Sequence, residues 1–413
     1  MTKISSSPES SGISPLDACS GAAPDDAEWA NLAAGHAAAF PGGVDVIIPA
    51  YGGYSETLRS IHRVLSARND TPFRLVVIDD ASPDPALGRR IAELAQAGLF
   101  LGLRNERNLG FVATANRGLK LGPGRDVILL NADTEVFDGW LDRLHAAAHS
   151  QARIGTVTPL SNAATILSYP LWLEDHTAPL ELSAATLDRL CALGGAAPVE
   201  IPTAIGFCMY LRRDCIEQVG LFDEAAFGRG YGEENDFCMR AAALGWKHVA
   251  AVNTYVWHWG GRSFGAEKAR RLEQAMHTLR RLHPHYEQTV RDFIERDPLA
   301  PLRASLDVAR IRRMAPRNRL GAAPPSVDAG ERGLLGLVRV SRWNGRRWRL
   351  RHDRLDRTPN LPQLDLRDGL DAAAQLLRAL GVDRVRPPAD FSGASRSALR
   401  QLAADIGAQW EGD

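Results

Sequence analysis

The sequence is poor in cysteine, and the few cysteines it has follow no metal-binding pattern. None belongs to a CxxC pair or has the spacing of a zinc site. An odd and sparse set predicts reduced thiols and a reducing, cytoplasmic compartment. Cys208 and Cys238 lie in apolar segments and are expected to be small core residues. The full set is Cys19, Cys191, Cys208, Cys215 and Cys238.

Long apolar runs are also missing. No stretch approaches the roughly 20 apolar residues that a helix needs to cross a bilayer. The first residues, MTKISSSPESSG, lack the apolar core of a signal peptide. We therefore expect a cytoplasmic protein, with any membrane contact peripheral and at the inner face of the cytoplasmic membrane. A length of 413 residues allows two or three domains, and 45% hydrophobic and 24% charged residues are ordinary for a soluble globular chain.

Lysine is absent from residues 301–413, which carry 21 arginines and 13 acidic residues. This tail has a formal charge of +8, and the first 300 residues have −8 because the whole chain is neutral. A basic tail on an acidic body predicts an anionic partner, such as a lipid headgroup, nucleic acid, a phosphorylated carrier or the body itself. A solvated arginine-rich surface is the alternative.

Residues 1–42 are rich in Ser, Ala, Gly and Pro and predict a disordered leader with a short helix near 26–39. From Val44 onward, apolar strands alternate with helices. The alternation predicts an α/β fold with a mostly parallel central sheet flanked by helices. The expected strands are 44–49, 73–80, 100–103, 126–131, 154–159, 205–213 and 247–258, with an irregular connection at about 161–200. The expected helices are 55–65 with Ser55 as its cap, 86–97, 111–121, one from about 138, 183–193, 233–244, 267–282 and 287–294.

Proline-rich stretches predict a linker at 299–329 between a domain at 43–298 and a small basic accessory domain at 330–413. Asn344-Gly345 predicts a hairpin in the accessory domain, and two helices are expected at about 367–380 and 394–408. Arginines alternate with Trp343 and Trp348 along the hairpin. This pattern suits nucleic-acid phosphates and bases, and it equally suits an anionic membrane surface or a lipid-diphosphate acceptor.

A buried strand ends abruptly in polar residues at DVILLNADTE, residues 126–135. Open α/β sheets bind ligands at the carboxyl ends of their strands, and a carboxylate there suits a hard divalent cation that holds phosphate oxygens. The alternative is a solvated turn in which Asp133 caps the next helix. Asp79 and Asp80 end another expected strand in the same way.

Two later segments carry further candidates. GYGEENDF, residues 230–237, places three acids at the start of a helix, where the helix dipole favours negative charge. The same crowding raises the pKa of a carboxyl group and makes it a better general base. His258 lies between two tryptophans before a Gly-Gly turn. A lone histidine is more often structural, but an imidazole with a carboxylate and diphosphate oxygens would suit Mn²⁺.

Taken in order, these segments resemble the inverting glycosyltransferases of family 2, which have the GT-A (nucleotide-diphospho-sugar transferase) fold. The resemblance covers residues 43–285 and is greatest to the branch with rhamnosyl- and galactofuranosyltransferases of cell-surface polysaccharides. The matching pieces are VIIPAY (46–51), VVIDDASPD (76–84), NERNLGFVATANRG (105–118), LLNADTEV (129–136), GLFDE (220–224), GEENDF (232–237) and WHWGGRSF (257–264).

The resemblance implies a role for each matching residue. Glu234 corresponds to the catalytic base, Glu233 beside it would contact donor or acceptor, and Asp236 in the same acidic turn is the third expected catalytic residue. Asp133 corresponds to the metal-binding acid of the Asp-x-Asp motif, and His258 to a later metal or phosphate ligand. The residues expected to hold the nucleotide sugar are Pro49, Ala50, Tyr51, Asp79, Asp80, Asn108, Gly110, Asn116, Asn131 and Ala132.

The implied reaction moves a sugar, with inversion, from a UDP- or dTDP-linked donor to a hydroxyl of a saccharide or lipid-linked acceptor, with Mn²⁺ or Mg²⁺ as cofactor. Nucleic acid is not an expected partner. The sequence departs from the family pattern at Asn131 and Glu234, where aspartate is commoner. Asn131 keeps open a catalytically inactive scaffold or sensor that binds nucleotide sugar. A further alternative is a shifted register of the Asp-x-Asp motif, in which Asp133 and Glu135 form the acid pair.

Overall fold

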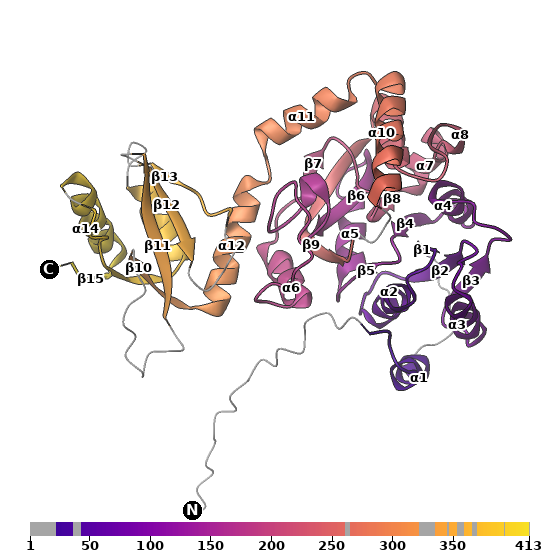
Figure 1. Ribbon diagram of the computed structural model, residues 1–413, viewed down its shortest axis with the longest axis horizontal. Helices are drawn as coiled ribbons and strands as arrows, with labels where there is room; N and C mark the ends of the chain where they lie inside the picture. The colour runs from indigo at the N-terminus through magenta and orange to yellow at the C-terminus, as the bar shows by residue number, and fades with distance from the viewer. Residues whose placement is uncertain are drawn as a thin grey trace, which may run out of the picture.

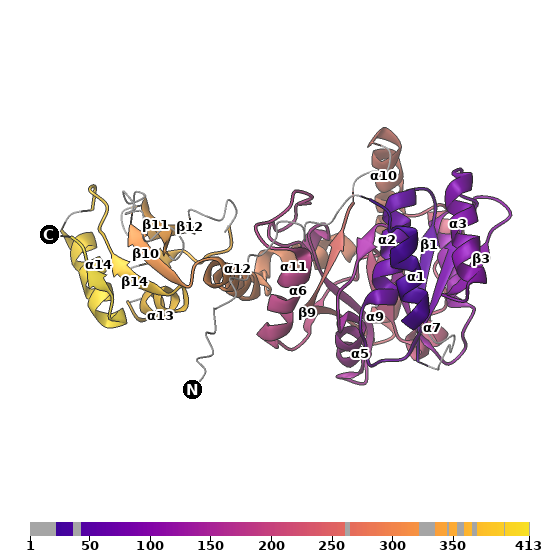
Figure 2. The same cartoon turned by 90° about the horizontal axis from the view of Figure 1, so that it is seen from below.

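The computed structural model describes residues 22–35, 43–260, 265–321, 335–344, 347–352, 359–365, 370–391 and 393–412. Most of the predicted leader, Cys19 and the Gly345-Arg346 turn lie outside the described residues, as do the side chains of 341–347. Two sheets lie at opposite ends of the molecule with a helix between them (Figures 1 and 2). The predicted α/β class is confirmed.

The first sheet has nine strands in the order β3-β2-β1-β4-β8-β6-β9-β5, and β7 also pairs with β9. Its first four strands are parallel, as predicted, whereas β8 runs antiparallel to both of its neighbours and makes the sheet mixed. The strands are β1 (Val44–Ala50), β2 (Phe73–Asp79), β3 (Leu101–Arg104), β4 (Asp126–Leu130), β5 (Thr134–Glu135), β6 (Ile154–Ser161), β7 (Val199–Ile201), β8 (Cys208–Leu211) and β9 (Lys247–His258).

Helices cover both faces of this sheet because its central strands are apolar on both sides. In β4, Ile128 packs into the core of one face and Val127 and Leu129 into the core of the other. Such two-sided burial is typical of strands in parallel sheets. The helices are α1 (Asp26–Gly35), α2 (Tyr54–Ser66), α3 (Pro85–Gln96), α4 (Phe111–Leu119), α5 (Trp140–His149), α6 (Ala184–Gly194), α7 (Arg213–Val219), α8 (Glu224–Phe227), α9 (Glu233–Ala243), α10 (Gly265–Leu282) and α11 (Tyr286–Arg296), with a 3-10 turn at Thr165–Leu167.

The cap of α2 differs from the predicted one. It is Gly53 and not Ser55, which lies inside the helix.

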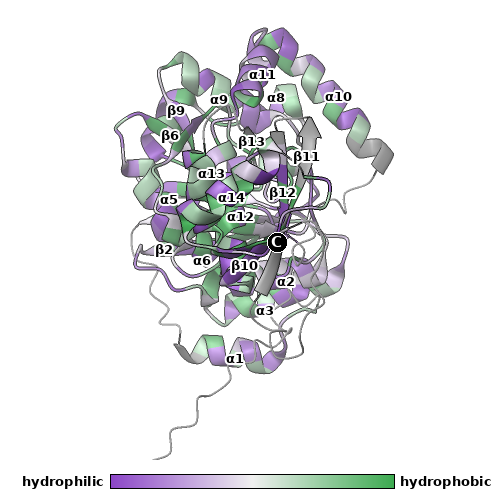
Figure 3. Ribbon diagram, turned by 90° about the vertical axis from the view of Figure 1, so that its left-hand side faces the viewer, coloured by the Kyte–Doolittle hydropathy of each residue, from purple (hydrophilic) through white to green (hydrophobic). Residues whose placement is uncertain are grey.

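The outer helices α10 and α11 carry many hydrophilic residues (Figure 3). None of the described helices is both long and apolar enough to span a bilayer. The four described cysteines are free and buried, which confirms Cys208 and Cys238 as core residues.

A second, six-stranded sheet forms the C-terminal part, in the order β13-β12-β11-β10-β14-β15. The predicted hairpin is confirmed, since β11 and β12 pair antiparallel. Trp348 is 1% exposed and packs inside this core, so it offers no surface for stacking a base. The elements are β10 (Arg317–Gly321), β11 (Leu335–Asn344), β12 (Arg347–His352), β13 (Leu364–Asp365), α13 (Asp371–Ala379), β14 (Val382–Val385), α14 (Ala394–Ile406) and β15 (Gln409–Trp410).

The predicted linker at 299–329 is wrong over its first half. Residues 300–314 form the helix α12 (Ala300–Met314), and β10 already belongs to the second sheet. Pro301 lies in the first turn of α12, where its missing N–H costs nothing because that group has no partner inside the helix. The proline was therefore a helix start and not a breaker.

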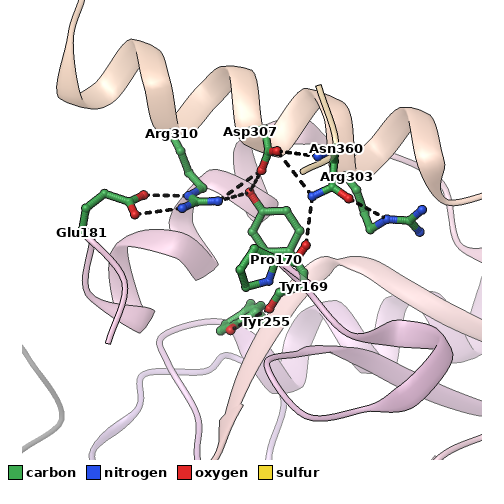
Figure 4. Close-up of polar contacts among 8 residues, drawn as sticks. All are labelled: Tyr169, Pro170, Glu181, Tyr255, Arg303, Asp307, Arg310 and Asn360. Atoms are coloured by element: carbon green, nitrogen blue, oxygen red, sulfur yellow. Dashed lines mark hydrogen bonds and ion pairs between the residues drawn. The ribbon is translucent and has the colours of Figure 1, made fainter. Parts of the chain in front are cut away.

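Buried polar contacts fix α12 to the first domain (Figure 4). Arg310 is fully buried, and its Nε and Nη2 donate to the two oxygens of Glu181 at 2.7 and 2.8 Å. The hydroxyl of Tyr169 donates to Asp307 at 2.7 Å, and Nη1 of Arg310 donates to that hydroxyl at 3.0 Å. Asn360, which precedes β13, donates to the other oxygen of Asp307 and to the carbonyl of Pro170. The junction is thus a hydrogen-bonded contact rather than a loose tether.

A buried histidine should make folding stability depend on pH. His248 in β9 is 3% exposed, and its ring bonds to Thr156 and to the carbonyl of Cys238. Burial lowers its pKa to about 4. The unfolded chain therefore binds the extra proton first, and stability falls as pH drops from about 6.5 towards about 4, by about 2 kcal/mol at pH ~5. Urea denaturation at neutral pH and at pH ~5 measures this loss.

We expect His248→Gln to reduce the loss by most of that amount, because glutamine carries no proton to bind. The exposed His277 on α10 supplies the control, and His277→Gln should keep the full pH dependence. Equal pH dependence in His248→Gln and the wild type would contradict the assignment.

Candidate active site

The ends of β1 and β2 form the first part of the site. Ala50 and Asp79 are partners in the register of these parallel strands, so Tyr51 and Asp80 emerge side by side at the carboxyl edge. The N–H of Asp80 donates to the carbonyl of Ala50 at 2.8 Å, which holds the two strand ends together. Pro49 lies inside β1, and Tyr51 is 50% exposed. Tyr51 is thus the one of these side chains that presents a broad surface to a ligand.

Asp79 and Asp80 are both buried and hold the chain around them. Asp79 pairs with Arg104 and accepts the N–H of Ser82 at 2.8 Å. Asp80 accepts the side chain of Asn105 at 2.7 Å. Asp80 also accepts the N–H groups of Leu109 and Gly110, each at 2.8 Å. Asp80 therefore shapes the 105–110 loop and has its oxygens occupied by it.

This loop lies against the segment that leads to the acidic turn. A Cβ on Gly110 would lie 2.8 Å from the Cα of Arg229, and its φ of +89° also favours glycine. The N–H of Phe111 donates to the carbonyl of Arg229 at 3.2 Å, and Arg229 also bonds to the Asn108 side chain. Two motifs more than 110 residues apart in the printed sequence are thereby brought into contact.

Asn116 takes a different place from the one expected. It is 1% exposed, and its amide bonds to the backbone of Phe222 at 2.9 and 3.0 Å and to Glu224 at 2.8 Å. These contacts fasten α4 to the 222–224 segment. The structure therefore turns Asn116 into the protein and not towards the strand ends.

Asp133 and His258 meet across the short antiparallel pair of β5 and β9, in which Thr134 is the partner of His258. Nε2 of His258 lies 3.3 Å from Oδ1 of Asp133, whose side chain is 36% exposed. Nδ1 of His258 lies 3.0 Å from the carbonyl oxygen of Ala163, to which it donates. Because that nitrogen holds the proton, a neutral ring presents the lone pair of Nε2 to the carboxylate. A cation, either a proton or a metal, is required between them.

The electrostatics of this pair agree with its geometry. Burial alone would raise the pKa of Asp133, but the hydrogen bond and charge of His258 and nearby N–H groups outweigh it, and the pKa is lowered. Burial alone would lower the pKa of His258, but Asp133 and the carbonyl of Ala163 raise it. The pair therefore favours a carboxylate and a cation.

Glu234 is linked to this pair through Gly206 and Phe207. A Cβ on Gly206 would lie 3.8 Å from the carboxyl carbon of Glu234. The next residue, Phe207, stacks on the ring of His258 with centroids 5.3 Å apart and planes at 18°. The carbonyl of Phe207 also accepts the N–H of Asn131 at 2.8 Å. One short segment before β8 therefore touches the acidic turn, the His258 ring and the end of β4.

The three acids of the turn have different environments. Oε2 of Glu233 and Oε2 of Glu234 are buried without a hydrogen-bond partner among the described residues. Burial raises the pKa of both carboxyl groups, and the charge of Glu234 raises that of Glu233 further. Asp236 instead accepts from Arg240 at 2.8 Å and from His283 at 2.7 Å. Asp236 therefore anchors α9 to the end of α10, whereas one oxygen of each glutamate keeps its capacity to accept a hydrogen bond.

The structure also decides between alternatives that the strand end left open. Asp133 is not a helix cap, because α5 begins after Gly139. Glu135 is 1% exposed and bonds to Arg63 at 3.1 Å and to the indole of Trp259 at 3.0 Å. Its oxygens are thus occupied, which argues against Asp133 and Glu135 as an acid pair. Asn131 and Ala132 lie between β4 and Asp133, at the carboxyl edge of the sheet.

Sequence analysis missed the residues that support His258. Asn162 accepts the N–H of His258 at 2.8 Å and donates to its carbonyl at 2.8 Å, and Ala163 receives the ring proton. Both lie in the stretch that showed no periodicity. A backbone carbonyl carries no sequence signal, and Phe207 looked like any apolar strand residue.

Residues 45–220 match the profile described as glycosyl transferase family 2. The N-acetylgalactosaminyltransferase 7 of Drosophila melanogaster is 29% identical over 109 residues, which are 25% of this chain and 18% of that protein. The match thus spans about a fifth of the length of this curated relative.

Two solved structures are similar to part of this chain. One is GalNAc-T7 with UDP, GalNAc and Mn²⁺, with a TM-score of 0.45 and 20% identity over 57% of this chain and 47% of that one. The other is the mannosyltransferase PcManGT of Pyrobaculum calidifontis with GDP-Man and Mn²⁺, with a TM-score of 0.41 and 16% identity over 68% and 81%. Residues 45–220, which include most strands of the first sheet, thus resemble glycosyl transferase family 2.

Proposed function

We propose that this chain is a glycosyltransferase, which moves a sugar, with inversion at the anomeric carbon, from a nucleotide-diphosphate donor to a hydroxyl of a saccharide or lipid-linked acceptor. The observation that carries the proposal is the unpartnered oxygen of Glu234 beside the Gly206–Phe207 segment, which also contacts His258. A single displacement needs a general base and a site for the diphosphate close to each other, and here both lie against the same segment.

Glu234 is the proposed general base. The acceptor hydroxyl gives its proton to the Glu234 carboxylate while its oxygen forms a bond to the anomeric carbon. The bond from that carbon to the diphosphate oxygen breaks on the opposite face, and its electron pair leaves with the nucleoside diphosphate. Attack from one face and departure from the other invert the configuration.

The donor is proposed to lie along the strand ends. The exposed ring of Tyr51 suits the nucleoside, and Asp79 and Asn131 flank it from β2 and β4. Asp80, Asn108 and Gly110 act through the shape of the 105–110 loop rather than by direct contact.

Asp133 and His258 fit a divalent metal such as Mn²⁺ or Mg²⁺. Their facing atoms are a carboxylate oxygen and an imidazole nitrogen whose tautomer is set by Ala163, an acceptable pair for Mn²⁺. A bound metal would neutralise charge on the diphosphate leaving group. Two protein ligands leave room for diphosphate oxygens.

The test is isothermal titration of the full chain with UDP, dTDP and GDP, each with and without Mn²⁺. We expect one nucleotide to bind in a metal-dependent way. Asp133→Ala should weaken that binding by at least about tenfold. Mutation of a residue that only hydrogen-bonds to a metal ligand already lowers metal affinity by about that factor, and loss of a ligand should cost no less. The exposed Asp138, five residues further on, gives the control variant Asp138→Ala, which should bind like the wild type. Equal binding by Asp133→Ala would remove Asp133 from the site.

A catalytically inactive scaffold is the second candidate, and Asn131 is the observation that favours it. Compared with the aspartate that is commoner at this position in the family pattern, asparagine has one negative charge fewer next to the proposed metal site. Binding of a nucleotide sugar without transfer or hydrolysis would support this role. The donor base and sugar, the branch near rhamnosyl- and galactofuranosyltransferases, and peripheral membrane contact through the basic tail remain predictions.

A further inference from the structure

A second group of chemistry-bearing side chains lies at the opposite edge of the first sheet. Asp126 is the first residue of β4, whereas Asp133 follows its last. A rise of about 3.3 Å per residue puts the two ends of β4 roughly 13 Å apart. His145 and His149 lie one turn apart on α5 and reach Asp126 at this edge.

These three residues converge closely. One ring nitrogen of each histidine and one oxygen of Asp126 lie within 4.8 Å of one another, and this is the group of three such residues found in the described part of the chain. Nε2 of His149 is 2.8 Å from Oδ2 of Asp126. The two imidazole rings have centroids 4.5 Å apart.

Neighbouring groups hold this arrangement in place. The hydroxyl of Tyr210, from β8, donates to Oδ2 of Asp126 at 2.6 Å, and Nδ1 of His145 lies 2.8 Å from the same hydroxyl. Because Tyr210 gives its only proton to Asp126, Nδ1 of His145 is the donor in the second contact. The N–H of Arg213 occupies the other oxygen of Asp126 at 2.8 Å. A neutral His145 thus keeps one ring lone pair for a ligand.

We propose that Asp126, His145 and His149 bind a divalent transition-metal ion, with Zn²⁺ as the preferred ion. Two imidazoles and one carboxylate, with water in the fourth position, form a ligand set that zinc accepts, and two histidines four residues apart on a helix are a common way to supply it. Mg²⁺ and Ca²⁺ prefer oxygen ligands. This proposal does not depend on the proposed transferase reaction.

The dimensions suit the ion. Bonds of about 2.0–2.1 Å in a tetrahedron place ligand atoms about 3.4 Å apart, so a pair of atoms at the 4.8 Å limit must close by about 1.4 Å. His149 makes this adjustment readily because its side chain is 41% exposed, which also gives the ion a path from solvent. The position near the C-terminus of α5 favours a cation.

The pKa values of two of the three residues are shifted. Burial and the charge of His149 lower the pKa of His145. Burial alone would raise the pKa of Asp126, but Tyr210, the N–H of Arg213 and His149 lower it. The Asp142 carboxylate adds negative charge near His145.

A bound ion would join α5 to β4 directly and to β8 through Tyr210. Since the site exists only in the folded chain, the ion should stabilise the fold. The site would thus act as a structural clip on the side of the sheet away from the donor.

The test is titration of the metal-free full chain with Zn²⁺, followed by calorimetry and by the thermal midpoint. Wild type should bind an ion that raises the midpoint. His149→Ala should bind it at least about tenfold more weakly, as loss of a ligand should cost no less than loss of a supporting residue. His277→Ala, at an exposed histidine of α10, is the matched control and should bind like the wild type.

Asp133→Ala separates this site from the donor site. The Asp133→Ala variant should bind Zn²⁺ like the wild type, whereas His149→Ala should not. The His149→Ala variant should in turn keep Mn²⁺-dependent nucleotide binding. Equal Zn²⁺ affinity in His149→Ala and His277→Ala would overturn the proposal. So would a wild type whose Zn²⁺ binding is removed entirely by Asp133→Ala.

Discussion

Replacing Glu234 by glutamine is expected to lower turnover by roughly 10²–10⁴-fold, the usual contribution of a general base. Glutamine keeps the size and hydrogen-bonding capacity of the side chain but cannot take the acceptor's proton. Binding of the nucleotide with metal should survive, because the donor contacts lie at the strand ends and at Asp133. Transfer assays with the donor found by titration measure the effect.

Two variants control this experiment. Glu217→Gln, at an exposed glutamate of α7, should leave turnover unchanged. Glu233→Gln tests the neighbouring acid, which is 4% exposed and whose pKa is raised further by the charge of Glu234. A near-normal rate in Glu234→Gln together with a large loss in Glu233→Gln would transfer the role of base to Glu233.

The pH dependence of the reaction should carry the same signature. Burial raises the pKa of Glu234 above that of an ordinary glutamate. Because the base works only when deprotonated, kcat/KM should fall as pH decreases through this raised value, at a higher pH than a solvated carboxyl would show. The residual activity of Glu234→Gln should lack this acidic limb.

Arg310→Met should lower the free energy of unfolding by about 3–5 kcal/mol, the range for removing one partner of a buried ion pair. The side chains of Arg310 and Asp307 are fully buried, and that of Glu181 is 16% exposed. Methionine leaves both carboxylates without their cation and removes a hydrogen bond to Tyr169. Urea denaturation measures the loss.

Arg313→Met is the matched control, since Arg313 lies on the same helix and is exposed. Its effect should stay within roughly 0.5 kcal/mol, as is usual at the surface. If Arg310→Met were no more destabilising than Arg313→Met, the junction would not be the tight contact described. Faster proteolysis near α12 in Arg310→Met alone would identify the junction as the region that opens.

The helices and strands of the first domain were largely predictable from the sequence. The strands at 44–49 and 126–131 are buried on both faces, and such strands need a continuous run of apolar residues, which is visible in the sequence. Their carboxyl ends fall at one edge of the sheet because the two strands are parallel. The linker was misjudged because Pro301 opens a helix as readily as it ends one. No periodic pattern marked β7 or the 161–170 segment.

By itself, then, the sequence determined the class of fold, the order of the motifs and the chemical types of the side chains at the strand ends. Only the tertiary structure decided which of those side chains face a ligand. Asp80, Asn116 and Asp236 are occupied by backbone and side-chain partners, whereas Glu234 and the Asp133–His258 pair are left with unmet capacity. The physical reason is that a carboxylate or an amide has the same chemistry wherever it occurs. Its function depends on whether burial and neighbours far away in the sequence have already satisfied its hydrogen bonds.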